Sequence, residues 1–102
     1  MATPPGGLMA APNRSEITAN TLQVDRLQDG SGKANLRITI LDTTDLEGPN
    51  FARSRIGEPV QAFTFDLPDN VTSGSTITAF AEYLGDATVG QFQLSDVVAK
   101  GV

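Results

Sequence analysis

Three carboxylates lie close together in the stretch DTTDLEG, at Asp42, Asp45 and Glu47. Carboxylate oxygens on a loop are ligands that calcium prefers, so this stretch is a calcium candidate. The spacing differs from the EF-hand pattern, in which acidic residues alternate ahead of a glycine. The alternative is a solvated loop in which aspartates form turns, and we favour it. We therefore predict that the protein needs no metal and no other cofactor.

A second stretch, NFARSRIGEP, carries side chains suited to binding another protein. Arginine and aromatic residues are enriched where protein interfaces are strongest. The prediction is that Phe51, Arg53, Arg55 and Ile56 contact a protein partner. In the alternative, the two apolar residues tuck beneath the loop and the arginines pair with the nearby acids.

The inventory of catalytic groups is small, because the sequence has no histidine and no cysteine. This absence excludes Ser-His-Asp and Cys-His arrangements within the chain, and also thiolate metal sites. Asp66 and Glu82 could in principle form a glycosidase pair. Threonines with strand propensity surround these two residues, so the simpler interpretation is that both lie on the solvated outer face of a sheet. We expect that the protein is not an enzyme.

Charge argues against nucleic acid as a partner. The chain carries 7 basic and 12 acidic residues, a net charge of −5. Residues 58–102 hold one lysine against six acidic residues, so that half repels phosphate backbones. The apolar runs are too short to cross a membrane, and the first residues lack the basic region of a secretory signal. We expect no membrane partner and synthesis in the cytoplasm.

Alternating apolar and polar residues predict five strands, at 17–27, 34–41, 60–67, 76–84 and 91–99. The turn residues of QDGSGK join the first two strands into a hairpin. A long irregular connection is expected at 42–59, and no helix is credible because Gly48-Pro49 interrupts its only helical pattern. The predicted core comprises Leu36, Ile38, Ile40, Phe63, Phe65, Ile77, Phe92 and Leu94.

These strands predict an all-β fold, either a small antiparallel β-sandwich, which we prefer, or a five-stranded OB-like barrel. Residues 16–102 form the single β domain. Residues 1–15 hold three prolines and two glycines, which oppose both helix and central strand, so they form an extended arm. We predict that Leu8 and Met9 anchor this arm to another subunit. The alternative is a disordered leader.

A small acidic β domain with an extended arm and no catalytic set resembles, in type, the decoration proteins of tailed-phage shells. The resemblance implies a structural or accessory subunit of a larger assembly, which binds neighbouring subunits through its arm and loops and can be incorporated into a virion. The alternative is a stand-alone module that binds a carbohydrate or a protein. The sequence offers few aromatic residues for a sugar-binding platform, since tryptophan is absent and there is one tyrosine.

Overall fold

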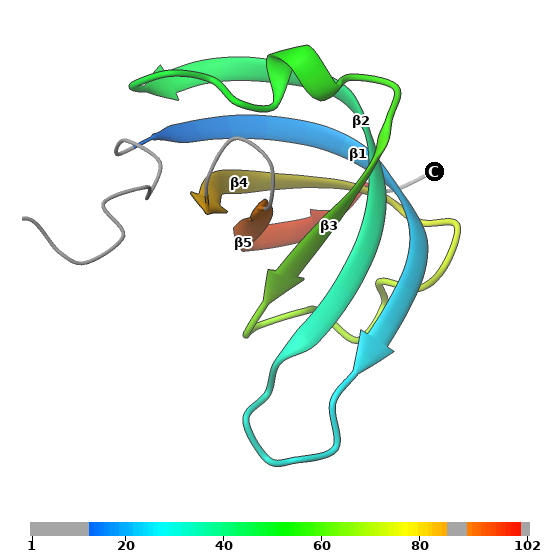
Figure 1. The fold of residues 1–102 in the computed structure, drawn as a ribbon. Helices are drawn as coiled ribbons and strands as arrows, with labels where there is room; N and C mark the ends of the chain where they lie inside the picture. Colours follow the sequence, from blue (N-terminus) through cyan, green and yellow to red (C-terminus); the bar gives the residue numbers. More distant parts are fainter. Residues whose placement is uncertain (1–12, 86–89, 101–102) are drawn as a thin grey trace, which may run out of the picture.

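Five strands close into a barrel in the computed structural model, which describes residues 13–85 and 90–100 (Figure 1). Around the barrel the strands follow the order β1-β2-β3-β5-β4, and β4 pairs again with β1. A single 3-10 turn, η1, precedes β3. The elements are β1 (Arg14–Arg26), β2 (Ala34–Glu47), η1 (Arg53–Arg55), β3 (Pro59–Thr64), β4 (Thr76–Gly85) and β5 (Gly90–Ala99).

The strand directions follow from the pairings. Neighbouring strands are antiparallel at four of the five seams. Alternating directions through these four seams leave β3 and β5 pointing the same way, so the fifth seam is parallel, at Ala62↔Phe92 and Phe63↔Gln93. The expectation of a wholly antiparallel sheet is therefore wrong at this seam. The OB-like barrel, the alternative architecture, fits the closed strand order.

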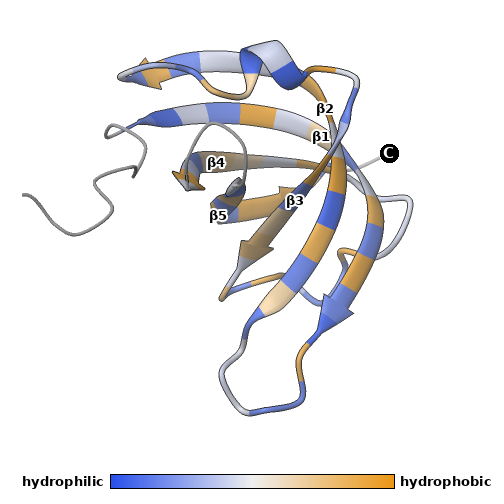
Figure 2. Cartoon of the chain, in the orientation of Figure 1, coloured by the Kyte–Doolittle hydropathy of each residue, from blue (hydrophilic) through white to orange (hydrophobic). Residues whose placement is uncertain are grey.

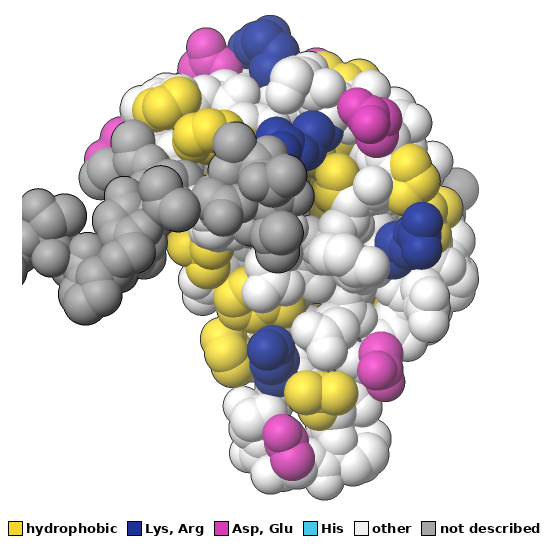
Figure 3. Space-filling view, in the orientation of Figure 1, with side chains coloured by type: hydrophobic (Ala, Val, Ile, Leu, Met, Phe, Trp, Pro, Cys, Tyr) yellow, Lys and Arg dark blue, Asp and Glu magenta, His cyan; other side chains and the backbone are white. Residues whose placement is uncertain are grey.

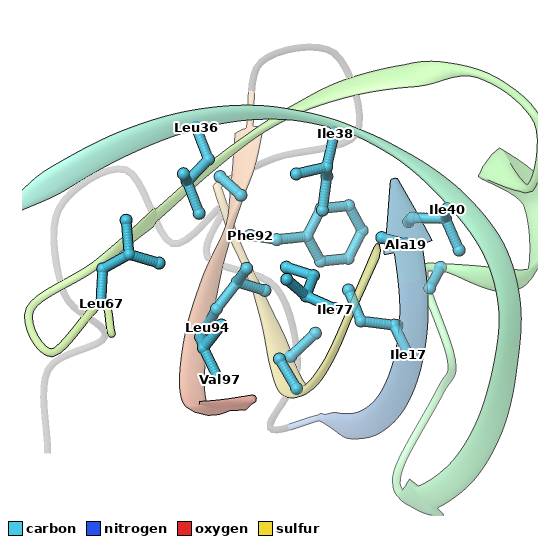
Figure 4. Packing of buried hydrophobic residues seen from close by; sticks show 14 of the residues in the cluster. Ile17, Ala19, Leu36, Ile38, Ile40, Leu67, Ile77, Phe92, Leu94 and Val97 are labelled. Atoms are coloured by element: carbon cyan, nitrogen blue, oxygen red, sulfur yellow. The ribbon is translucent and has the colours of Figure 1, made fainter. Parts of the chain in front are cut away.

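The barrel interior is filled by the residues that alternate inward along each strand. Colouring by hydropathy shows this alternation clearly on β1 and β2 (Figure 2). Phe92 lies at the centre of the core, surrounded by Ile38, Ile77 and Leu94 (Figure 4). Six of the eight predicted core residues belong to the core cluster. The two exceptions are Phe63, which is buried outside this cluster, and Phe65, which is 52% exposed.

The second strand is longer than the sequence predicts. Residues 42–47, expected in an irregular connection, continue β2 and pair with residues 14–18 of β1. Thr43 faces inward there and donates to the carbonyl of Glu16 (2.9 Å). Leu41 and Asp42 interrupt the alternation of apolar and polar residues. The sequence of this strand alone therefore does not indicate that β2 continues to Glu47.

Loops close both ends of the barrel. Val71 and Leu67, from the connection between β3 and β4, are buried in the core, as is Ala52 from the connection between β2 and β3. Arg26 holds the connection between β3 and β4 in place, because its guanidinium donates to the carbonyls of Leu67, Pro68 and Val71. Within the described residues, no helix is long and apolar enough to cross a membrane.

Candidate functional site

The predicted interface loop is mostly engaged by its own domain. Phe51 stacks on Tyr83 with ring centroids 5.0 Å apart. Arg55 lies 4.7 Å above the same tyrosine ring and donates to the carbonyl of Phe51 (2.9 Å). Arg53 pairs with Asp45 across 2.7 Å. Of the four residues, Ile56 keeps its apolar side chain largely exposed, at 43%.

The three carboxylates of the calcium candidate have separate surroundings. Arg53 and Asn50 both donate to Asp45, and these hydrogen bonds lower the pKa of Asp45 below its ordinary value. Asp42 accepts from the backbone amide of Thr43. Glu47 lies at the end of β2. Among residues 13–85 and 90–100, no three acidic side chains form a set that could hold a metal ion.

Leu8 and Met9, the predicted anchors of the arm, lie outside the described residues. The first described residue, Asn13, bonds in both directions to the backbone of Tyr83 on β4, at 2.8 and 3.1 Å. Strand β1 then begins at Arg14, two residues before the predicted start of the domain. Asp66 and Glu82, the pair considered for glycoside hydrolysis, are exposed on segments that do not pair with each other.

A site that the sequence did not predict lies on the outer surface of β1, β2 and β3. A depression of about 210 Å³ is lined there by five polar side chains and part of Leu36. The cross-strand register explains the grouping, because residues directly opposite each other share a face of the sheet. Gln23, Arg37 and Gln61 stand in one row, and Asp25, Asn35 and Phe63 in the next. We call the five polar residues the polar face: Gln23, Asp25, Asn35, Arg37 and Gln61.

The side chains of the polar face make no hydrogen bond to other residues in the part of the chain that the structure describes. Asn35 and Arg37 are held on the outer face of β2, since their alternating neighbours Leu36 and Ile38 are buried in the core. The space-filling view shows uncharged surface over β2 and β3, bordered by basic, acidic and apolar side chains (Figure 3).

An aromatic pair adjoins the polar face along β3. The inward-facing residues of this strand are Ala62 and Thr64, so Phe63 lies on the outer surface. Phe63 is nevertheless buried, because the rings of Phe65 (centroid distance 5.8 Å, interplanar angle 87°) and the ammonium group of Lys33 (4.9 Å) cover it. The strand ends at Thr64, and Phe65 follows it with half of its surface exposed.

The sequence contained part of this information. Alternation in 34–41 already placed Asn35 and Arg37 on one face of their strand. It does not reveal which residues of β1 and β3 stand beside them, because that depends on the register between strands. The chain matches no protein-family model, no curated protein and no solved structure.

Proposed function

We propose that the protein is a non-enzymatic carbohydrate-binding module, an OB-like barrel that binds a neutral, hydroxyl-rich ligand on its polar face. The observation that carries the proposal is the group of five polar side chains around one depression, none of which bonds to a residue that the structure describes. Amides, a carboxylate and a guanidinium together offer both acceptors and donors. Sugar hydroxyls both donate and accept hydrogen bonds, so they match such a mixed set.

The charge of the face favours a neutral ligand. Asp25 and Arg37 contribute one charge of each sign, and the amides contribute none. Barrels of the OB type bind oligosaccharides and oligonucleotides on the face of strands 2 and 3. Oligonucleotide sites combine stacked aromatics with a positively charged groove. The carboxylate of Asp25 in this face and the net charge of −5 favour the oligosaccharide.

A glycan array followed by calorimetric titration tests this function. Asp25→Asn should weaken binding of a glycan at least tenfold, since it removes an acceptor from the depression. The matched control is Glu16→Gln, which removes an exposed carboxylate from the same strand beside Phe80, outside the depression. Equal binding by both variants would contradict the proposal. Binding of an oligodeoxynucleotide in place of every glycan would also overturn it.

A second candidate function is the structural or accessory subunit of an assembly, for example a decoration protein of a phage particle. It is favoured by three exposed apolar side chains on β2 and on the connection from β2 to β3: Leu41, Leu46 and Ile56. The amide of Gly57 donates to the carbonyl of Ile40, which brings the chain at Ile56 beside Leu41. These residues and the arm would contact neighbouring subunits, with no nucleic acid or membrane involved.

Light scattering on the eluting protein tests this second function. The full chain should associate, and deletion of residues 2–12 should weaken association while the β-type circular dichroism spectrum is retained. A full-length chain that stays monomeric and binds no particle would refute the assembly role. A truncated chain that associates as well as the full one would remove the arm from it.

A further inference from the structure

Phe65 is a half-exposed aromatic ring that contacts Phe63 on one side. Its edge-to-face contact with Phe63 sets the angle between the rings at 87°. Phe63 is itself fixed, since it is buried and covered by Lys33. Exposing an aromatic ring on the surface gains no core burial for the domain. An exposed ring supported on one side by a buried neighbour leaves apolar surface on which a flat ligand ring could stack.

The position of this ring defines the length of the site. Lys33, Asn35 and Arg37 follow one another at two-residue spacing where the chain enters and continues along β2. Four residues of extended chain span roughly 13 Å, which exceeds one sugar ring. Phe63 stands opposite Asn35, and Phe65 is placed beyond it by the ring contact. The depression and Phe65 therefore lie in succession along one direction of the sheet.

We propose that Phe65 stacks against one ring of an oligosaccharide whose other rings occupy the depression, so that the site selects chains of several sugars over single sugars and disaccharides. This inference rests on the carbohydrate-binding function proposed above. The C–H groups of a pyranose face carry slight positive charge and are attracted to the negative face of an aromatic ring. The polar face supplies hydrogen bonds to the hydroxyls of the remaining rings.

The experiment measures the affinity of glucose hexaoses with β-1,4, β-1,3 and α-1,4 linkages, and of the matching disaccharides, by calorimetric titration. The wild type should bind one hexaose at least tenfold more tightly than its disaccharide. Phe65→Ala should remove this advantage and leave disaccharide binding within about twofold. Phe65→Leu, which keeps an apolar side chain without a ring, should recover only part of the advantage. The matched control is Val98→Ala, which trims an exposed apolar side chain on β5.

The outcomes separate this inference from the function on which it rests. If Phe65→Ala preserves the ratio of hexaose to disaccharide affinity while Asp25→Asn still weakens binding, the stacking role is refuted and the function stands. If the wild type binds no glycan in the array or in titration, both are refuted. Circular dichroism melts of each variant verify that the change in affinity does not arise from unfolding.

Discussion

Removing the guanidinium of Arg26 should release the loop that closes one end of the barrel. Arg26 is half-buried at the end of β1 and donates to three carbonyls, those of Pro68 (2.8 Å), Val71 (2.9 Å) and Leu67 (3.3 Å). The loop in turn places the fully buried Val71 in the core. Arg26→Met keeps much of the apolar stem but leaves these carbonyls without their donor.

The size of the effect follows from the number of hydrogen bonds lost and from their partial exposure. A hydrogen bond to a charged group contributes about 1.5–3 kcal/mol net when buried, and partial exposure reduces that value. Two short bonds and one long bond therefore predict a loss of about 2–4 kcal/mol. For a domain of this size, that loss lowers the melting temperature by roughly 10–20 °C. Arg26→Lys should recover a minor part, since an ammonium group is compact and lacks the broad planar fork of guanidinium.

Urea unfolding followed by circular dichroism measures this loss. The matched control is Arg37→Met, because Arg37 is exposed and its side chain bonds to no described residue. It should change the free energy of unfolding by less than about 0.5 kcal/mol. Hydrogen exchange should show faster opening of residues 67–75 in Arg26→Met alone. Equal stabilities of the two variants would refute the view that Arg26 holds the loop.

Three further variants test single features of the structure. Gly90→Ala should cost about 1–3 kcal/mol in a thermal melt, since a Cβ would overlap the Tyr83 hydroxyl and a backbone carbonyl. Asp96 adopts a φ of 51°, so Asp96→Val should destabilise by about 1–2 kcal/mol, measured in urea. The pKa of Asp45 is lowered by Arg53, so its stabilisation is present above the ordinary carboxyl pKa and lost as pH falls through the lowered one. The melting difference between wild type and Asp45→Asn should therefore vanish at low pH.

Much of the fold could be predicted because alternation reports which residues face inward. The pattern in β4 is an example, since Ile77, Ala79, Ala81 and Tyr83 are all buried as it indicates. The prediction fails where the register shifts. In β1 a shift between Thr21 and Gln23 buries Thr21 and exposes Leu22, contrary to hydrophobicity. Bulges of this kind are set by pairing with neighbouring strands, which one strand's sequence does not contain.

The error at Phe65 has a different origin. Phe63, Phe65 and Leu67 alternate as strongly as the residues of any core strand, so the sequence predicts that all three face the core. The structure instead directs the small residues Ala62 and Thr64 inward on β3. Phe92, on the neighbouring β5, already fills the centre of the core. A barrel of five strands has little interior volume, so Phe63 on β3 and Phe65 just after it lie outside the interior.

The same limit on volume explains why the proposed ligand site lies on the outer surface. Side chains fill the interior, and loops from both connections close its ends. The outer surfaces of the strands differ in how many of their side chains contact one another. Along β1 and β4, Thr76 donates to Asn20 (3.0 Å), and Arg14 lies 4.5 Å above the ring of Phe80. The polar face makes no such internal pairs among the described residues, so its donors and acceptors are available to a ligand without a competing bond within the protein.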